Sequence, residues 1–510
     1  MSDNFYDIVA ARFPANPDAP FIELGSGAVL SYGDLAATSA RYAHLLRSLG
    51  VVKGDRVAVQ VEKSAEAVFL YLACLRVGAA YLPLNTAYTR AEISYFLTDA
   101  APRVFVCAPT TEEGLRDTAA EAGVGTVLTL GANGEGSLSE RAAGQPTGFD
   151  TVACGPDELG AILYTSGTTG RSKGAMLTHR NLASNAATLH ALWGFQPDDV
   201  LLHMLPIFHT HGLFVAINCV LMNGSSMLFQ AKFDADTVFR LLPRATVMMG
   251  VPTFYTRLLA DDRLTREATA HMRLFISGSA PLLADTHREF FARTGKPILE
   301  RYGMTETGML TSNPLNGERI PGTVGFPLPG VSVRVADEKT GEPLATGAIG
   351  VIEVKGPNVF IGYWRMPEKT AQEFRADGFF ITGDVGKIDE QGYVHIIGRA
   401  KDLVISGGFN VYPKEVETVI DGIDGVVESA VVGVPHPDFG EAVVAVVLRK
   451  PGADTPDDAA VIRACKEQLA NFKVPKAVVF TDELPRNTMG KVQKNLLRQA
   501  HKDLFDKRAA

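Results

Sequence analysis

Hydroxyl side chains, glycines and positive charge are concentrated in one short stretch, YTSGTTGRSKG, at residues 164–174. Glycine-rich turns present successive backbone N–H groups to an anion, hydroxyls add donors, and a nearby lysine supplies charge without imposing one geometry. The stretch is not a Walker A loop, because no Gly-Lys pair followed by Ser or Thr comes after the glycines. It predicts another kind of phosphate loop, suited to the β- and γ-phosphates of ATP, although a surface loop rich in Ser, Thr and Gly has a similar composition. The residues that we expect to contact ATP are Thr165, Ser166, Gly167, Thr168, Thr169, Gly170 and Lys173.

The composition is that of an ordinary soluble chain. Of the 510 residues 46% are hydrophobic and 21% are charged, so more than one domain is expected. A formal net charge of −8 without a long basic tract disfavours nucleic acid and favours small-molecule partners. No signal-peptide pattern and no membrane-spanning apolar run are present, so we expect a cytoplasmic protein without a membrane partner. Zinc is disfavoured because the five cysteines are far apart, and we expect them to be buried: Cys74, Cys107, Cys154, Cys219 and Cys465.

The elements that must position the phosphate loop follow an α/β pattern. Short β-branched runs alternate with amphipathic stretches, as in RVAVQV at 56–61, TVMMG at 246–250 and RLFIS at 273–277. Thr89, three residues before Glu92, predicts a capping box at a helix start. After about residue 398 a polar, glycine-rich passage leads into a compact region with two strand patterns and one helix pattern. We therefore predict a large N-terminal domain at 1–398 and a smaller α+β domain at 399–510.

Seven motifs occur in order along most of the chain: YTSGTTGRSKG, LPIFHTHG, SGSAPL, RYGMTET, GYW with TGD, GRAKDLVISGG and PRNTMGK. Together they resemble the acyl-adenylate-forming superfamily, which includes acyl-CoA synthetases, luciferases and the adenylation domains of peptide synthetases. The resemblance implies a large domain of layered sheets and helices with a smaller mobile C-terminal domain. It also implies that ATP and Mg²⁺ activate a carboxylic acid as its adenylate, which then reacts with a thiol such as coenzyme A.

The resemblance gives roles to residues that contact the nucleotide. Glu306 resembles the carboxylate that supports Mg²⁺, and Thr305 resembles a donor to the α-phosphate. Asp384 resembles the acceptor of both ribose hydroxyls, because a carboxylate offers two acceptor oxygens, and Arg399 resembles a second contact to the ribose or phosphate. A turn-forming Gly-Asp and a core tyrosine are the structural alternatives for Asp384 and Tyr302. The expected adenine slot consists of Ser279, Ala280, Pro281, Tyr302, Gly303 and Met304.

The resemblance also implies that the small domain turns about Lys401 after adenylation. In the first pose Lys491 bridges the carboxylate and α-phosphate oxygens, a task that suits a mobile point charge. In the second pose Gly407 and Gly408 line a passage for the pantetheine arm of coenzyme A. A solvated lysine is the structural alternative for Lys491. Lysines in this setting are acetylated in related synthetases, so an acetyltransferase and a deacetylase are possible partners.

The acid is indicated by Arg257, which the resemblance places along the acyl pocket. A guanidinium there favours a substrate with a second carboxylate, of which malonate is the shortest that fits, so the chain is most similar to malonyl-CoA synthetases. Ser279 could donate to the distal carboxylate, and Thr210 and Met309 would limit the α-carbon substituents, so methylmalonate is also expected. The alternative is that Arg257 reaches the surface or pairs with an acidic residue such as Asp261.

His209 is expected between the acid pocket and the thiol passage, where an amino-acid-activating enzyme would need an aspartate for the substrate ammonium. The peptide-synthetase interpretation is thereby weakened. Coenzyme A ligation of another short acid, a stand-alone adenylation enzyme that loads a carrier protein, and a non-catalytic relative of the same fold remain as alternatives.

Overall fold

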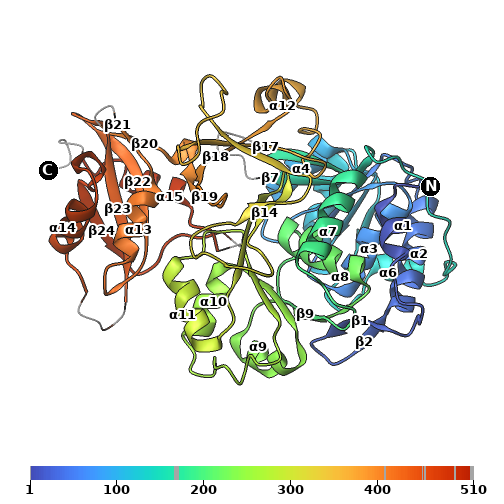
Figure 1. The fold of residues 1–510 in the computed structure, drawn as a ribbon. Coiled ribbons are helices and arrows are strands. Elements are labelled where there is room, and N and C mark those ends of the chain that lie inside the picture. The colour runs from blue at the N-terminus through green and yellow to red at the C-terminus, as the bar shows by residue number, and fades with distance from the viewer. Residues whose placement is uncertain are drawn as a thin grey trace.

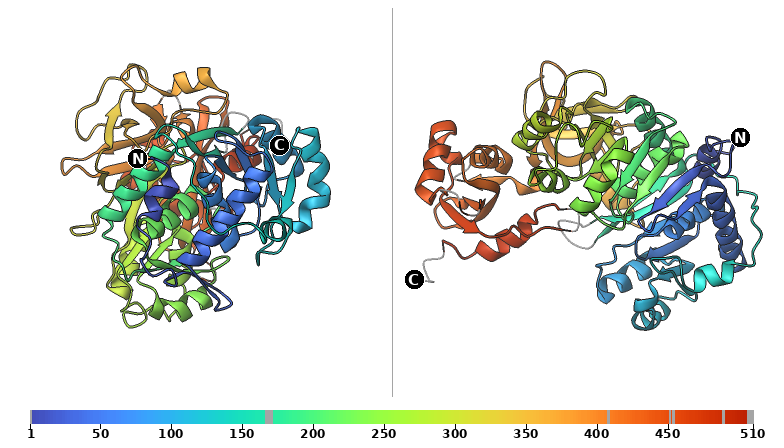
Figure 2. Two further views of the ribbon diagram at one scale, coloured as in Figure 1. Left: turned by 90° about the vertical axis from the view of Figure 1, so that its right-hand side faces the viewer. Right: turned by 90° about the horizontal axis from the view of Figure 1, so that it is seen from below.

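The computed structural model describes residues 2–165, 172–406, 409–450, 452, 455–487 and 490–505. A large main body, at the right in Figure 1, contains three sheets with their helices, and a smaller lobe of C-terminal residues lies at the left. The right-hand view of Figure 2 shows the same division. The predicted fold class, a large α/β part with a smaller α+β part, is confirmed.

A six-stranded sheet carries the phosphate loop. Its strand order is β6-β5-β3-β4-β7-β8, and all neighbours are parallel except the antiparallel pair β7–β8. The strands are β3 (Arg56–Gln60), β4 (Ala80–Pro83), β5 (Val104–Cys107), β6 (Val127–Thr129), β7 (Leu159–Thr165) and β8 (Lys173–Thr178). The helices of the same chain region are α1 (Phe5–Ala10), α2 (Tyr32–Ser48), α3 (Ala65–Arg76), α4 (Arg90–Ala100), α5 (Glu112–Glu121), α6 (Ser137–Ala142) and α7 (His179–Leu192), with a short 3₁₀ turn at Pro109–Thr111. Thr89 and Glu92 form the predicted capping box of α4.

A nine-stranded sheet has the order β15-β14-β13-β12-β11-β9-β10-β1-β2, and its central strands from β13 to β1 are parallel. The strands are β1 (Pro20–Leu24), β2 (Val29–Ser31), β9 (Val200–His203), β10 (Ser226–Phe229), β11 (Val247–Gly250), β12 (Leu274–Ser277), β13 (Leu299–Met304), β14 (Gly308–Ser312) and β15 (Phe326–Pro327). Between them lie the π-helix η2 (His211–Ile217), α8 (Asn218–Asn223), α9 (Ala235–Leu241), η3 (Leu242–Arg244), α10 (Pro252–Leu259) and α11 (Ala284–Thr294).

Two further sheets follow, the first antiparallel and the second antiparallel except for the parallel pair β23–β24. The third sheet of the main body pairs β16 (Ser332–Ala336), β17 (Gly350–Lys355), β18 (Phe380–Ile388) and β19 (Val394–Arg399), and α12 (Pro367–Glu373) precedes β18. After the short turn η4 (Ala400–Asp402), the chain enters a new sheet. This sheet of the smaller lobe contains β20 (Val404–Ser406), β21 (Phe409–Val411), β22 (Val426–His436), β23 (Gly440–Arg449) and β24 (Ala477–Thr481), with α13 (Pro413–Asp421), α14 (Asp458–Gln468), η5 (Asn471–Lys473) and α15 (Lys494–His501).

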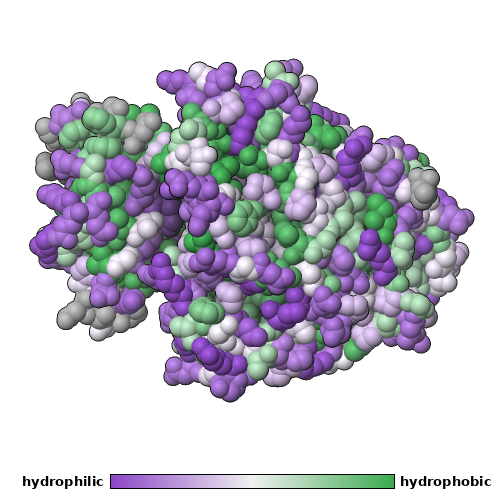
Figure 3. All heavy atoms as spheres, viewed as in Figure 1, coloured by the Kyte–Doolittle hydropathy of each residue, from purple (hydrophilic) through white to green (hydrophobic). Residues whose placement is uncertain are grey.

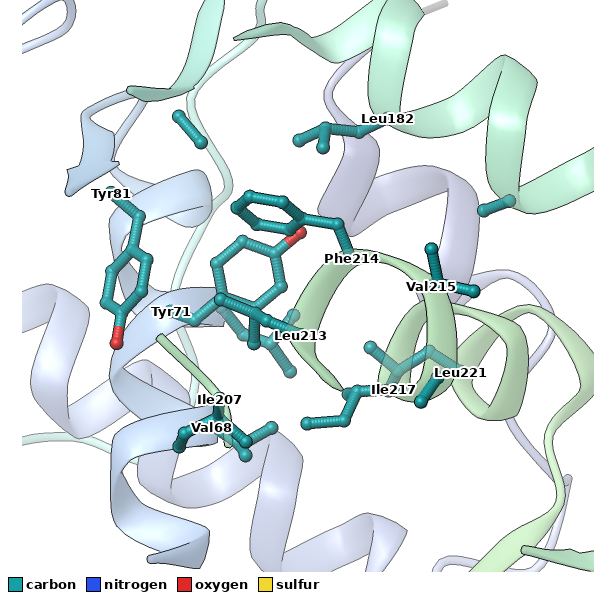
Figure 4. Packing of buried hydrophobic residues seen from close by; sticks show 14 of the residues in the cluster. Val68, Tyr71, Tyr81, Leu182, Ile207, Leu213, Phe214, Val215, Ile217 and Leu221 are labelled. Atoms are coloured by element: carbon teal, nitrogen blue, oxygen red, sulfur yellow. The ribbon is translucent and has the colours of Figure 1, made fainter. Parts of the chain in front are cut away.

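The main hydrophobic core lies between the six- and nine-stranded sheets. Figure 4 shows the side chains of η2 packed against Val68 and Tyr71 of α3 and Leu182 of α7. Tyr71 and Phe214 have ring centroids 5.6 Å apart. All five cysteines are buried and free, as predicted. Among the described residues no helix is both long and apolar enough to cross a bilayer.

Candidate active site

Most of the predicted site residues follow the carboxyl ends of neighbouring parallel strands. The order β13-β12-β11-β9 brings together the segments that leave these four strands at one edge of the sheet. His209 follows β9, α10 follows β11, Ser279 follows β12, and Tyr302 lies near the end of β13. Open α/β sheets bind ligands at this edge, because the segments that leave the strands converge there. The topology thus gathers residues that are nearly 100 positions apart in the sequence.

The HTHG motif is held from behind by two buried polar groups. Nε2 of His203 bonds to the carbonyl oxygen of Gly212 at 2.9 Å, so this nitrogen carries the proton. Lys63 Nζ donates to His203 Nδ1 at 2.8 Å. A Cβ added at Gly212 would lie 2.1 Å from the carbonyl oxygen of Pro206, so the chain turns there only with glycine. These contacts, together with the apolar packing of η2, fix the position of the backbone that carries His209 and His211.

His209 is neutral. Its Nδ1 accepts the backbone N–H of His211 at 3.2 Å, which leaves the ring proton on Nε2. Burial, followed by the charges of Arg301 and Lys491, lowers the pKa of His209 to about 4. The residue therefore offers a neutral donor at physiological pH.

Arg301 is a buried cation that the sequence motifs did not single out. Its side chain is 3% exposed, and its Nε and Nη2 atoms have no hydrogen-bond partner in the described part of the chain. No acidic side chain among the described residues lies within 4.0 Å of it as an ion-pair partner. The adjacent Glu300 does not neutralise it, because burial raises the pKa of Glu300 to about 8. Burial lowers the pKa of Arg301 to about 10, which leaves it charged near neutral pH.

Gly278 and His211 lie close to Arg301. A Cβ added at Gly278 would lie 2.3 Å from the guanidinium carbon of Arg301, so the glycine of SGSAPL makes room for this side chain. His211 Nδ1 bonds to Ser279 Oγ at 3.1 Å, and its buried Nε2 has no partner among the described residues. Burial and then the charge of Arg301 lower the pKa of His211 well below 6.5. Thr210 and Met309 are both buried, and Thr210 Oγ1 likewise has no described partner.

Three side chains meet at the expected ribose position. Asp384 and Arg399 are cross-strand neighbours on β18 and β19, and Arg399 Nε lies 2.7 Å from Asp384 Oδ1. The Tyr302 hydroxyl donates to Asp384 Oδ2. Burial first, and then the carboxylate of Asp384, raise the pKa of Tyr302 well above 10. Tyr302, Gly303, Met304 and Thr305 are partly buried, as are Ser279 and Ala280, whereas Pro281 is exposed.

The phosphate loop joins β7 to β8, where Thr165 and Lys173 are register partners. Ser166, Gly167, Thr168, Thr169 and Gly170, together with Gly407 and Gly408, which were predicted to line the coenzyme A passage, lie outside the described residues. Lys173 Nζ is 3.3 Å from Glu373 of α12 and 4.1 Å from the ring centroid of Tyr363. The Tyr363 hydroxyl donates to Glu306 Oε1 at 3.0 Å.

The residues around Glu306 fit a magnesium ion that is shared with a nucleotide. No cluster of three metal-binding side chains occurs in the described ranges. Magnesium bound with ATP needs only one or two protein carboxylates, because phosphates and water supply the other ligands. Glu306 is buried, and burial raises the pKa of its carboxyl, which a nearby cation would reverse. A single carboxylate is therefore the donor set that a shared ion requires.

Lys491 reaches the site from the smaller lobe. Its loop is closed by Asn487, whose Oδ1 accepts the N–H of Lys491 at 3.0 Å. A Cβ added at Gly490 would lie 3.1 Å from Thr253 Oγ1, so the loop packs on α10 of the main body. Desolvation, and then the charge of Arg399, lower the pKa of Lys491, while Asp384 opposes this shift. Figure 3 shows a groove between the smaller lobe and the main body.

Two other predicted residues have distinct settings. Lys401 lies in η4 between the sheets, and desolvation lowers its pKa to about 8. Arg257 is exposed on α10, with its guanidinium 5.9 Å from the ring centroid of Phe233, while Asp261 pairs with Arg263. Its place in the acid pocket stays a prediction.

Sequence reasoning missed Arg301, His211 and Tyr363. The sequence did carry a signal for Arg301. The first two residues of ERYGMTET, Glu300 and Arg301, place two charged side chains inside a strand of a buried sheet. His211 resembled a satisfied core histidine, and its unpaired Nε2 is visible only in three dimensions. The tyrosine of GYW gave no local signal, since its partners Lys173 and Glu306 are distant in sequence.

Comparison with known proteins identifies the relatives. The family model described as AMP-binding enzyme matches residues 9–364, and that of the AMP-binding enzyme C-terminal domain matches 415–491. Feruloyl-CoA synthase from Amycolatopsis is 36% identical over 492 residues, which is 96% of this chain and 97% of that protein. Malonate–CoA ligase from Arabidopsis thaliana is 33% identical over 522 residues, which covers 93% and 85% of the two chains.

Solved structures match more closely. ATP-bound MatB from Rhodopseudomonas palustris is 61% identical, with a TM-score of 0.97 over 99% of this chain and 100% of that one. Apo MatB from the same organism covers the same shares with a TM-score of 0.86. The chain therefore superposes better on the nucleotide-bound form.

Proposed function

Because the chain belongs to the AMP-binding enzyme family, we propose that it ligates malonate to coenzyme A in an ATP-dependent reaction that releases AMP and pyrophosphate. ATP and coenzyme A are the substrates of the family's CoA ligases. Methylmalonate is the expected second substrate. The name of the Arabidopsis relative and the 61% identity to MatB support this proposal.

The buried guanidinium of Arg301 is the observation that carries the choice of acid. A buried charge without a partner destabilises a fold, so such a group is retained where a ligand pairs with it. A monocarboxylate would bring its single charge to ATP and leave Arg301 uncompensated. The distal carboxylate of malonate supplies the missing charge, and the hydrogen-bonded pair of Ser279 and His211 supplies one further donor.

The first half-reaction joins a carboxylate oxygen of the acid to the α-phosphorus of ATP, and pyrophosphate leaves. Lys491 neutralises the developing charge between the two anions, and Thr305 donates to the α-phosphate. Asp384 accepts the ribose hydroxyls, and Tyr302 lies beside the base. Magnesium held at Glu306 would screen the β- and γ-phosphates. The chain superposes better on ATP-bound MatB than on apo MatB. This supports the interpretation that the present arrangement of the two lobes is the one that forms the adenylate.

The second half-reaction requires a different arrangement. The coenzyme A sulfur attacks the acyl carbon, AMP leaves, and the thiol proton passes to solvent. We propose that the domain boundary falls at residues 398 and 399, with Lys401 as the pivot and Gly407 and Gly408 lining the thiol passage. The change of sheet between β19 and β20 supports this division.

Two further proposals concern the setting of the enzyme. Cytoplasmic location would give access to ATP and coenzyme A. Acetylation of Lys491 by a lysine acetyltransferase, reversed by a deacetylase, would remove the charge that adenylation needs. Protein acetylated at Lys491 should form no acyl-adenylate, and full adenylation by that protein would contradict the proposed control.

A substrate panel tests the main proposal. AMP and pyrophosphate release is measured with ATP, Mg²⁺ and coenzyme A for malonate, methylmalonate, acetate and butyrate. We expect malonate to have the highest kcat/KM, by about a hundredfold or more over butyrate, which cannot pair with a buried cation. A preference for acetate or butyrate would contradict the malonate assignment. If a pantetheinylated carrier protein replaced coenzyme A as the better acceptor, the enzyme would load a carrier.

A further inference from the structure

Tyr363 contacts both Glu306 and Lys173, the groups proposed to hold Mg²⁺ and the phosphates of ATP. Its hydroxyl donates to Glu306 Oε1 at 3.0 Å, and its ring centroid lies 4.1 Å from Lys173 Nζ. The side chain is buried, with 3% of its surface exposed. We propose that Tyr363 is a positioning residue for Mg²⁺ and ATP, which orients the carboxylate of Glu306 and keeps Lys173 apart from it. This inference rests on the proposed roles of Glu306 and Lys173.

The segment that carries Tyr363 is fixed on both sides. Met176 N–H donates to the carbonyl of Gly362 at 3.0 Å, and Trp364 N–H donates to that of Gly174 at 2.8 Å, which attaches the segment to β8. On the other side Phe360 N–H donates to the carbonyl of Glu306 at 2.7 Å. The segment is thus a rigid bridge between the exit of the phosphate loop and the metal carboxylate.

A residue of α12 sets the backbone of Tyr363. Thr370 Oγ1 accepts the N–H of Tyr363 at 2.9 Å and donates to the carbonyl of Met366 at 2.9 Å. The ring direction is therefore determined by the turn before α12 as well as by packing. Side chains locked in this way hold a site to the geometry that catalysis needs.

The proposed role requires both the aromatic ring and the hydroxyl group of Tyr363. Lys173 and Glu306 both contact Tyr363, and a lysine and a glutamate that share one neighbour would ordinarily pair and neutralise each other. Among the described residues, however, Lys173 pairs with Glu373, at 3.3 Å, and not with Glu306. The ring attracts the ammonium by a cation–π contact and physically separates it from Glu306. The hydroxyl meanwhile satisfies one oxygen of a buried carboxylate and fixes its orientation. Lys173 is thus kept from pairing with Glu306, whose second oxygen stays available to the metal.

Two substitutions separate these roles. Tyr363→Phe keeps the ring and removes the hydroxyl, whereas Tyr363→Leu removes both. Binding of the uncleavable α,β-methylene analogue of ATP is measured by calorimetry without metal, and binding of Mn²⁺ to the analogue complex by electron paramagnetic resonance. Neither measurement needs an acid substrate. Tyr393→Phe is the matched control, because its hydroxyl donates to the carbonyl of Glu318 at 2.8 Å, outside the site.

We expect Tyr363→Phe to weaken Mn²⁺ binding by roughly tenfold, the effect of losing a partner of a metal ligand, with metal-free analogue binding unchanged. Tyr363→Leu should weaken both, because Lys173 can then pair with Glu306. Wild-type Mn²⁺ affinity in Tyr363→Phe would overturn the inference. Glu306→Gln distinguishes the two failures. If it too binds Mn²⁺ like the wild type, the proposed role of Glu306 is wrong, and if it alone loses Mn²⁺, only the role of Tyr363 is wrong.

Discussion

Replacing Arg301 with leucine should abolish the preference for malonate. The distal carboxylate would then be buried without its partner, which costs about 3–5 kcal/mol, or roughly a hundred- to several-thousand-fold in kcat/KM. Butyrate, whose methyl group suits an apolar wall, should be used as well as before or better. The measurement is AMP release with each acid at saturating ATP and coenzyme A.

The substitution should not unfold the protein, because it replaces an unpaired buried charge with a hydrophobic side chain. A thermal unfolding midpoint at or above that of the wild type is therefore the control. Arg257→Leu provides the matched comparison, since Arg257 is exposed on α10. If Arg257→Leu alone removes malonate use, the original placement of Arg257 in the pocket is right and Arg301 has another role. Unchanged malonate use in Arg301→Leu would contradict the assignment of Arg301.

Replacing Lys491 with alanine should stop adenylation and leave thioester formation intact. The ammonium is proposed to act only while the acid attacks ATP, and loss of one such electrostatic contact lowers rates by about a hundred- to a thousandfold. Malonate-dependent exchange of labelled pyrophosphate into ATP measures the first half-reaction. Release of AMP from supplied malonyl-adenylate with coenzyme A measures the second.

Lys502→Ala is a suitable control, because Lys502 is an exposed lysine of the same C-terminal segment. A variant that is slow in both half-reactions would indicate a damaged lobe. Normal pyrophosphate exchange in Lys491→Ala would show that the pose seen here does not represent adenylation.

The sequence predicted the elements well where their local patterns were strong. The runs RVAVQV, TVMMG and RLFIS became β3, β11 and β12, and the helix pattern predicted in the smaller domain, DDAAVIRACKEQLA, became α14. Each has a clear period and recognisable ends, so little depended on tertiary context. The change to a polar, glycine-rich sequence near residue 398 coincides with the end of β19 at Arg399.

The site was predicted less completely, because contacts between distant segments have no local signature. The motifs located Asp384 and Arg399, yet their ion pair depends on the register of β18 with β19. The charged pair at the start of ERYGMTET marked Arg301 as unusual but gave it no role, since its importance lies in Nε and Nη2 atoms that have no hydrogen-bond partner in the described part of the chain. Arg257 attracted attention as a charge in an apolar stretch, but an amphipathic helix also exposes such a residue at its surface.

The order of residues along the chain has a consequence for the reaction cycle. With Lys401 as the proposed pivot, the β20–β21 hairpin and Lys491 both lie beyond it, while Asp384 and Arg399 lie before it. One rotation would therefore withdraw the lysine and deliver the hairpin in a single movement. The enzyme would then need no separate signal to stop ATP consumption before thiol binds. A lobe that is turned toward the thiol has already moved Lys491 away from ATP.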